Sequence, residues 1–404
     1  MKLRKTLIGV LALAVVPMAL NSVVFAQAAP TVKVKIGVMG PFTGPAASIG
    51  TEQLNWSKLA VEDFNKATGW SVELVQGDTE LDAAKAVTVA ASMIADPDIY
   101  AVVGPSGSQE VEATGAAFKE ARLVNVSPSA TRPSLTTSGF DTFFRVVPTD
   151  SAQGPTDADY ISQELEATKL FIIDDQSSYA VGLADEVTKD FETDTAKVVG
   201  RESVKKEDSD FSSLATKIGA SGAEVVFFPG QIASQGAALA KALKEQNIDV
   251  TLFGADGFFS VDDFIKGAAG ATEGAYISAF APDIHTLASA ADVVKRYGDE
   301  YGTFGTFGPP SYAATTVLLE AIKRASDAGS VTRETVLAEV AKTDQEQSIL
   351  GGPLAFDKNG DVKDASFYIF QVKDGNFVSV ETPTGEATEM APSMEATAEA
   401  TASG

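Results

Sequence analysis

Short apolar runs alternate with longer stretches of helical periodicity along most of the chain. Seven apolar runs have the length of a buried strand: 34–40, 72–78, 99–104, 123–128, 169–175, 224–230 and 250–256. Between the first four of them, apolar residues recur at helical spacing in three stretches: 49–67, 82–95 and 108–121. Because apolar strands that alternate with helices form parallel sheets covered on both faces, the pattern predicts an α/β fold.

The segments that follow these strands are small, polar or rich in glycine, as in "GPSGS" (104–108), "SPSAT" (127–131) and "GADG" (254–257). One such loop is explained by ordinary turn chemistry. Seven of them, spread over two sheets, favour a binding site, because open parallel sheets bind ligands outside the carboxyl ends of their strands. We therefore expect a ligand cleft between two lobes.

The two ends of the chain differ from the part between them. Residues 1–26 join a basic start to an apolar run and then to small residues, which is typical of a secretory signal peptide. The apolar run is too short for a membrane span. Residues 381–404 consist largely of Ala, Thr and Glu and predict a disordered tail. The roughly 355 residues between these ends favour two domains.

Composition narrows the classes of function. The formal net charge is −24, so we expect no binding to nucleic acid or to an anionic membrane. The chain has no cysteine, which excludes disulfides, thiolate metal sites, cysteine nucleophiles and a lipid-anchored cysteine. A secreted chain without cysteine or an anchor fits the bacterial periplasm.

The residues offer little for catalysis or for metal binding. His285 is the only histidine and stands in what looks like a surface connection. No G-x-S-x-G elbow, Walker loop or transition-metal cluster is present, so we expect no enzyme and no cofactor. The acidic stretch at 357–361 hints at a calcium loop, but its glycine comes too early, and an Asn359-Gly360 hairpin turn is favoured. A second hairpin turn is predicted at Asp374-Gly375.

Two hydroxyl-bearing loops are the candidates for binding. Ser106 or Ser108 can cap the helix that follows, and Ser106 with Gln109 fits a capping box. These serines then either only finish the helix or place its N-terminus at a carboxylate or phosphate. Ser129 and Thr131 form the second cluster, which is either a self-bonded loop or part of the same anion site.

Several segments carry a resemblance to a known family. "IGVMGPFTGPAASIGTEQLNWSKLAVEDFN", "VVGPSGS", "VSPSAT", "FFRVVPTDSAQGP" and "DDQSSYAVGLA" occur in order with familiar gaps. The chain resembles, over about 32–380, the periplasmic substrate-binding proteins of ABC transporters for branched-chain amino acids, of the leucine-binding type. The resemblance implies a periplasmic binding protein type I fold, with two Rossmann-like lobes joined by three hinge strands.

The resemblance also implies where the chain crosses between the lobes. The crossings are expected near 147–149, 278–281 and 352–355. Lobe 1 then comprises 31–147 plus 281–352, and lobe 2 comprises 149–278 plus 355–380.

The family's ligand residues carry over by position. Ser108, Ser129 and Thr131 match the site for the ligand's α-carboxylate, and Asp256 matches the acid that pairs with its ammonium group. Tyr179 and Phe307 match aromatic walls. Five positions depart from relatives, and the first is Asp256, where the acid is often Glu, which is one methylene longer. Ile49 and Gln231 stand where branched-chain binders often have aromatic residues, and Leu81 with Gly107 replaces a cysteine pair found in some of them.

The function implied is capture of an amino acid, branched-chain or related, by lobe closure. The expected partners are a membrane permease and its ATPase subunits, and the expected form is a monomer. The altered walls keep a second ligand class open, namely an amide, urea or an aromatic acid, bound for transport or for sensing. A secreted hydrolase is the least favoured reading.

Overall fold

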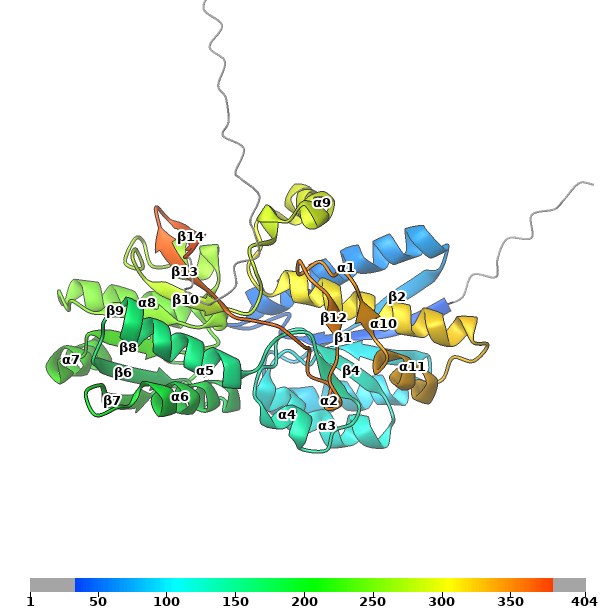
Figure 1. Cartoon of the computed structure of the whole chain (residues 1–404), viewed down its shortest axis with the longest axis horizontal. Coiled ribbons are helices and arrows are strands. Elements are labelled where there is room, and N and C mark those ends of the chain that lie inside the picture. Colours follow the sequence, from blue (N-terminus) through cyan, green and yellow to red (C-terminus); the bar gives the residue numbers. More distant parts are fainter. Residues whose placement is uncertain (1–32, 381–404) are drawn as a thin grey trace, which may run out of the picture. The chain divides into compact units, whose positions relative to one another are not determined.

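The computed structural model describes residues 33–380, and the predicted signal peptide and tail lie outside these described residues. The first sheet has the order β2-β1-β3-β4-β5, and all its strands are parallel (Figure 1). Its strands are β1 (Lys33–Gly40), β2 (Ser71–Asp78), β3 (Ile99–Val103), β4 (Val124–Ser127) and β5 (Phe143–Arg145). The strand β5 was not predicted, because it is only three residues long.

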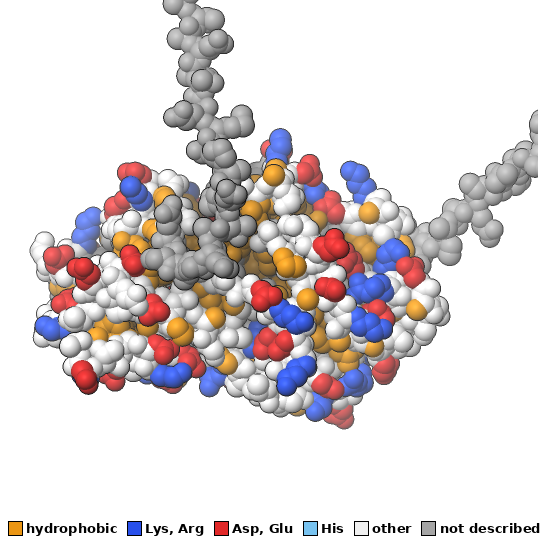
Figure 2. Space-filling view, in the orientation of Figure 1, with side chains coloured by type: hydrophobic (Ala, Val, Ile, Leu, Met, Phe, Trp, Pro, Cys, Tyr) orange, Lys and Arg blue, Asp and Glu red, His pale blue; other side chains and the backbone are white. Residues whose placement is uncertain are grey.

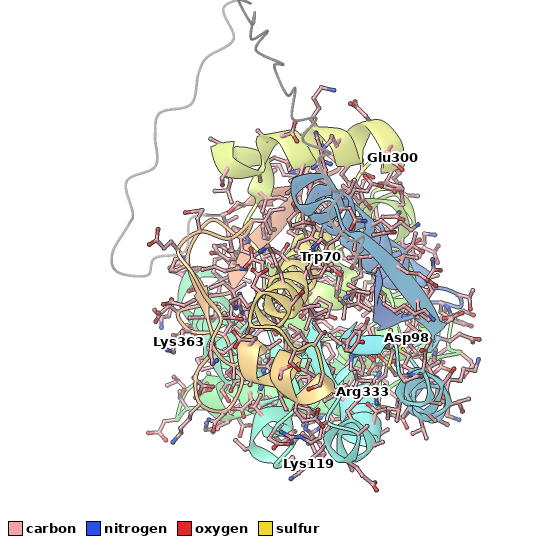
Figure 3. All side chains as sticks on the ribbon, turned by 90° about the vertical axis from the view of Figure 1, so that its right-hand side faces the viewer. Trp70, Asp98, Lys119, Glu300, Arg333 and Lys363 are labelled. Carbon is pink, nitrogen blue, oxygen red and sulfur yellow. The ribbon has the colours of Figure 1, made fainter. Side chains whose placement is uncertain are left out.

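Helices cover both faces of the first sheet. They are α1 (Ala47–Thr68), α2 (Ala83–Ala95), α3 (Ser108–Glu120), α4 (Ser134–Thr137), α9 (Ala291–Tyr301), α10 (Gly308–Asp327) and α11 (Arg333–Val340). Alternate strand residues face α1, α10 and α11 on one side and α2 and α3 on the other. The guanidinium of Arg333, labelled in Figure 3, donates to the carbonyl oxygens of Ile94, Asp96 and Ile99 and ties α11 to the turn before β3.

The second sheet has the order β14-β13-β10-β9-β8-β6-β7. Its strands are β6 (Lys169–Asp174), β7 (Lys197–Ser203), β8 (Val225–Phe228), β9 (Thr251–Gly254), β10 (Tyr276–Ala279), β13 (Tyr368–Lys373) and β14 (Asn376–Ser379). The last two are antiparallel and meet at the predicted Asp374-Gly375 turn. A separate two-stranded sheet pairs β11 (Asp344–Gln345) with β12 (Leu354–Ala355).

Helices cover this sheet on both faces as well. On one side lie α5 (Asp150–Asp159), its continuation η1 (Tyr160–Glu164) and α6 (Ser178–Phe191), and on the other lie α7 (Ser212–Ser221) and α8 (Ala233–Glu245). Short helical turns complete the fold: η2 (Asp256–Phe258), η3 (Val261–Lys266), η4 (Ile284–Thr286) and η5 (Ala288–Ala290). No helix among residues 33–380 is long and apolar enough to cross a membrane. The predicted α/β fold with two helix-covered parallel sheets is confirmed.

The last passage of the chain between the two sheets differs from the expected position at 352–355. Leu354 and Phe356 are buried in the core of the first sheet, and Val362 packs against that core. The side chain of Arg145 at the end of β5 is fully buried, and its Nε donates to Asp361 Oδ1 at 2.5 Å. Because a buried guanidinium needs a charged partner, Arg145 holds the 354–362 segment on the first sheet, and the chain leaves it only after Val362.

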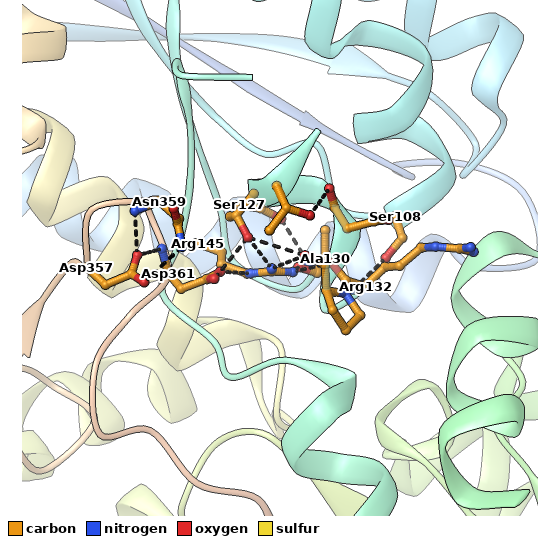
Figure 4. Close-up of polar contacts among 12 residues, drawn as sticks. Ser108, Ser127, Ala130, Arg132, Arg145, Asp357, Asn359 and Asp361 are labelled. Atoms are coloured by element: carbon orange, nitrogen blue, oxygen red, sulfur yellow. Dashed lines mark hydrogen bonds and ion pairs between the residues drawn. The ribbon is translucent and has the colours of Figure 1, made fainter. Parts of the chain in front are cut away.

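The predicted turn at Asn359-Gly360 is confirmed. Asp357 Oδ1 accepts hydrogen bonds from the backbone N–H groups of Asn359 and Asp361, at 2.8 and 3.0 Å. Asp361 in turn is committed to Arg145 (Figure 4). The acidic residues of this stretch therefore act as turn formers and as an ion-pair partner.

Candidate ligand-binding site

One small cavity brings together residues from the strand ends of both sheets. Its lining comprises Ile49, Leu81, Ser106, Ser108, Ser129, Tyr179, Gln231, Asp256, Gly257 and Phe307. Seven of the eight predicted site residues are among them. The exception is Thr131, whose buried hydroxyl has no hydrogen-bond partner in the described part of the chain and lies beside Asp150. The volume of the cavity is about 20 Å³, which is room for about one water molecule.

The turn between β3 and α3 forms one wall of this cavity. Gly104 begins it with φ 110°, and a Cβ there would lie 2.3 Å from Met39 O, so only glycine fits. The predicted capping box of Ser106 with Gln109 is wrong by one residue. Gly107 is the N-cap, and its N–H donates to Glu110 Oε2 at 2.6 Å. Burial raises the pKa of Glu110 to about 7, which weakens the negative charge that this carboxyl brings to the helix start.

Ser106 has a different partner from the one predicted. Its hydroxyl donates to Gln53 Oε1 at 2.5 Å, and Gln53 Nε2 donates to Ser129 Oγ at 2.9 Å. Ser129 Oγ closes the ring by donating to the carbonyl of Ser106 at 2.8 Å. Since this ring is buried, it fixes the two hydroxyl loops relative to α1, and it does not engage the Ser108 hydroxyl or the N-terminus of α3.

The loop after β4 is held from beneath by Arg145 (Figure 4). Arg145 Nη1 donates to the carbonyls of Ala130 and Arg132, at 3.1 and 2.7 Å. Ser127 Oγ accepts from the N–H of Ala130 at 2.9 Å and donates to the carbonyl of Pro105 at 2.6 Å, so it joins this loop to the β3–α3 turn. The two loops therefore form one rigid unit.

The opposite wall carries an acid without a cation. Asp256 is 4% exposed, and its Oδ1 accepts from Tyr179 OH at 2.6 Å and from Gln153 Nε2 at 3.3 Å. No Lys, Arg or His among the described residues forms a salt bridge with it. Burial raises the pKa of Asp256 to about 6 and also raises the pKa of the Tyr179 hydroxyl. A buried carboxylate in such surroundings favours a cationic partner.

Apolar side chains complete the cavity between its two polar ends. Ile49, Leu81 and Phe307 belong to one buried cluster, and Phe307 packs edge-on against Phe280 at a ring distance of 5.3 Å. Leu81 was predicted only as a replaced cysteine. A Cβ on Gly107 would lie 2.9 Å from Leu81 Cδ1, so the two matched positions are neighbours.

Sequence reasoning missed Ser106 and Gly257 as lining residues. Ser106 was interpreted as a helix cap. Gly257 follows the predicted acid, and a Cβ there would lie 2.2 Å from Gly230 O. Glycine at this position therefore allows η2 to approach the loop between β8 and α8. The signal in the sequence was the Asp256-Gly257 pair, separated from the end of β9 by one residue.

Three hydrogen bonds link the first sheet's loops with the second sheet's loops around the cavity. Gln109 Nε2 donates to Gln231 Oε1 at 3.0 Å, Lys206 Nζ to Glu80 O at 2.6 Å, and Arg132 Nη1 to Ser178 O at 2.5 Å. Gln109 and Gln231, together with Leu81, also line a larger hollow of about 280 Å³.

Other candidate chemistry lies outside this site. His285 is in the short turn η4, its side chain is 58% exposed, and its Nδ1 lies 2.8 Å from Asp283 Oδ1. The predicted surface position is confirmed. Within residues 33–380 no group of three or more metal-ligating side chains could hold a metal ion.

Known proteins are similar to this chain in sequence and in fold. The family model for periplasmic binding proteins matches residues 33–376. A Leu/Ile/Val-binding protein homologue of Brucella melitensis is 30% identical over 369 residues, which cover 90% of this chain and 99% of that protein. A leucine-binding protein of Thermotoga maritima has a TM-score of 0.78 and 27% identity, covering 86% of this chain and 98% of that one.

A third match has a ligand in its structure. A branched-chain amino acid transporter substrate-binding protein of Streptococcus pneumoniae, solved in complex with isoleucine, has a TM-score of 0.77 and 26% identity, and covers 86% of this chain and all of that one. The family match spans both sheets and the cavity between them. The chain therefore belongs to the periplasmic binding protein family and has its type I fold.

Proposed function

We propose that this protein is the solute-binding component of an ABC importer and captures an amino acid between its two lobes. The observation that carries the proposal is one cavity with opposite chemistry at its two ends. One end has hydroxyls and a helix N-terminus, and the other has a buried acid without a cation. An amino acid zwitterion carries a carboxylate for the first end and an ammonium group for the second.

The carboxylate end is built by α3 and the loop after β4. The start of α3 offers N–H groups and a partial positive charge to an anion. The Ser108 hydroxyl stands at the same place and already accepts from the N–H of Arg132 at 3.3 Å, which leaves its own proton to donate. The ring of Gln53, Ser106 and Ser129 fixes these groups before the ligand arrives, so little order is lost on binding.

The ammonium end is built by Asp256, with Tyr179 beside it. An ammonium group at Asp256 would give this carboxylate the cation that it lacks, and hydrogen bonds between charged groups are worth about 1.5–3 kcal/mol each. Because Asp256 follows β9 of the second sheet and Ser108 follows β3 of the first, one ligand would bind both lobes.

The size of the cavity requires movement. At about 20 Å³ it admits no amino acid, so the lobes must separate for entry. Closure is then driven only by what the ligand gains in the closed form over the open one. Changing the ratio of closed to open from 1:99 to 99:1 needs about 5.5 kcal/mol of such difference, which a charge pair and a few charged hydrogen bonds supply.

A second ligand class is favoured by one observation. The amides of Gln109 and Gln231 meet beside the cavity, where branched-chain binders often have an aromatic residue at the second position. Amide groups pair better with a polar side chain than with a hydrocarbon, so an amide-bearing ligand, or urea, is the alternative within the same fold. An aromatic acid, and a role in sensing, belong to the same alternative.

Membership of the periplasmic binding protein family supports a proposal about partners and location. We propose that the closed form docks on a membrane permease with its ATPase subunits, that the protein acts as a monomer in the periplasm, and that it has no catalytic role. The surface in Figure 2 mixes acidic and basic side chains without one dominant basic area, which agrees with a small-molecule ligand rather than nucleic acid.

A thermal-shift screen tests the proposal. The protein is unfolded and refolded to remove carried-over ligand, then heated with single amino acids, amides, urea and small aromatic acids. A ligand at 100 times its Kd adds about 2.7 kcal/mol to the free energy of unfolding. We expect a shift with L-leucine or another aliphatic amino acid and none with its deaminated analogue. A shift with amides or acids alone would replace the amino acid by the alternative class.

A further inference from the structure

A stripe of polar residues is buried on α5, behind the ammonium end of the cavity. Asp150, Gln153 and Asp157 are each 0% exposed. Their spacing of three and four residues places them on one helix face. A buried helix face is normally apolar, so this stripe costs stability unless its groups are satisfied.

Hydrogen bonds connect the stripe with the cavity. Gln153 Nε2 donates both to Asp256 Oδ1 at 3.3 Å and to Ser278 Oγ at 2.9 Å. Ser278 Oγ donates to Asp157 Oδ2 at 3.0 Å. A continuous path of polar atoms therefore leads from the cavity-lining acid Asp256 to the buried acid Asp157.

The acids of this region form a trio, Asp150, Asp157 and Asp256, that contains no cation. The titratable groups facing the trio are Tyr179 on α6 and, toward Asp150, Arg132 and Arg145. Both guanidinium groups have acids of their own outside the trio, namely Glu112 for Arg132 and Asp361 for Arg145.

Several acceptor atoms of the stripe have no donor. They are both carboxyl oxygens of Asp150, Oδ1 of Asp157 and Oε1 of Gln153. The Thr131 hydroxyl favours the charged form of Asp150 from close by, but it meets hydrogen-bonding geometry with neither oxygen. A proton on a carboxyl group turns an acceptor into a donor, so protonated carboxyl groups would supply the donors that these acceptors otherwise lack.

The protonation of the trio agrees with this geometry. Burial, and then the charge of Asp256, raise the pKa of Asp150 to about 7. Burial also raises the pKa of Asp157, and the pKa of Asp256 is about 6. Near neutral pH the unliganded trio therefore holds protons.

We propose that an ammonium-bearing ligand, on binding at Asp256, expels a proton from the trio of Asp150, Asp157 and Asp256. The inference rests on the proposed function. The O–H bond of one carboxyl breaks, its electron pair stays on the oxygen, and the proton passes to water and buffer. The ammonium group keeps its own three protons and replaces the lost positive charge. Gln153 and Ser278 are positioning residues, which transmit the change from Asp256 to Asp157.

The proposed coupling predicts in which direction ligand affinity changes with pH. Because the binding-competent acid is ionised, affinity falls as pH falls through the pKa of Asp256, by about tenfold per pH unit below it. With a pKa of about 6, binding at pH 5 is about tenfold weaker than at pH 8. Asp256 alone would release about half a proton per ligand at pH 6, where it is half protonated, and nearly none at pH 8. Release above these amounts comes from Asp150 and Asp157.

Titration calorimetry tests this with L-leucine and the full mature chain. The binding heat at pH 6 is measured in two buffers of different protonation enthalpy, and the difference gives the protons released. Kd is measured from pH 5 to pH 8. Equal heats in the two buffers and a flat Kd would overturn the proton coupling and keep the amino-acid function. If no amino acid of the screen bound, the proposed function would fail together with the coupling.

A matched pair of variants tests whether Asp157 takes part in the proton release. Asp157→Asn keeps the shape and the acceptor for Ser278 but removes one acid, so it lowers proton release and shifts the pH midpoint of Kd to lower pH. Asp159→Asn makes the same change on an exposed residue of the same helix and should leave both unchanged. If Asp157→Asn behaved like Asp159→Asn, the proton would belong to Asp256 alone and the trio would be disproved. Thermal melts confirm that both variants fold.

Discussion

The two ends of the cavity solve the problem of burying polar groups in opposite ways. At the first-sheet end, Gln53, Ser106 and Ser129 satisfy one another, and buried Arg145 has both a carboxylate and carbonyl partners. At the second-sheet end, Asp150 has two oxygens without a donor and Asp256 has no cation. A satisfied network is rigid, whereas an unsatisfied one is stabilised by what binds to it. We therefore propose that the first end is a preformed template and that the second end makes ligand binding depend on charge.

The largest effect is expected on stability, when Arg145 at the first-sheet end is replaced. Arg145→Met leaves the half-buried Asp361 without its ion-pair partner and the carbonyls of Ala130 and Arg132 without their donor. Breaking such a buried pair costs about 3–5 kcal/mol of unfolding free energy, measured by urea denaturation. The control is Arg122→Met, whose partner Asp141 lies at the surface and whose loss costs at most about 1 kcal/mol. Equal losses in the two variants would show that Arg145 does not anchor the loop.

The next largest effect is expected on ligand affinity when the charge at the second-sheet end of the cavity is removed. Asp256→Asn keeps the acceptor for Tyr179 but removes the charge that pairs with an ammonium group. Removing one partner of a buried charge pair costs about 2–5 kcal/mol, so calorimetry should give a Kd for an amino acid about 30-fold to several thousand-fold higher. The folded protein should lose no stability without ligand, because the variant removes a buried charge. An unchanged Kd would exclude Asp256 as the ammonium partner.

Arg145 and Asp256 also illustrate what can and cannot be predicted from the sequence. The strand ends and Ser108, Ser129, Tyr179 and Asp256 could be placed because turns and apolar runs are local signals, and the family resemblance supplied their roles. The ion pair of Arg145 with Asp361 joins positions 216 residues apart, and no local pattern indicates it.

The polar stripe on α5 was hidden for a different reason. Asp150, Gln153 and Asp157 have the spacing of an ordinary solvent-facing helix stripe, so only the structure reveals that they are buried. The helix cap was misplaced by one residue, because Gln109 and Glu110 both fit the sequence pattern, and the geometry of Gly107 selects Glu110.

The pH dependence of stability sharpens the comparison without any ligand. Asp150 and Asp256 have pKa values raised to about 7 and about 6, above the value near 3.8 expected of an unfolded chain. The folded state therefore binds more protons, and stability falls as pH rises through these pKa values. From these two acids we expect the free energy of unfolding to be about 4 kcal/mol lower at pH 8 than at pH 5. Asp150→Asn should flatten this slope in urea titrations, and an equally steep slope in the variant would contradict the assignment.

The smallest effect concerns the contact that crosses between the two ends. Gln109 Nε2 donates to Gln231 Oε1, and one such bond contributes about 0.5–1.5 kcal/mol net. Gln109→Leu should therefore weaken closure and raise the Kd for a hydrophobic amino acid by about two- to tenfold at most. If the alternative ligand class is right, the same variant should discriminate more strongly against an amide ligand, because the amide loses a polar neighbour. Gln163→Leu is the control, since Gln163 bonds only to Asp159 on the exposed side of its helix. A Kd that does not change for either ligand would show that the two glutamines only fill space beside the cavity.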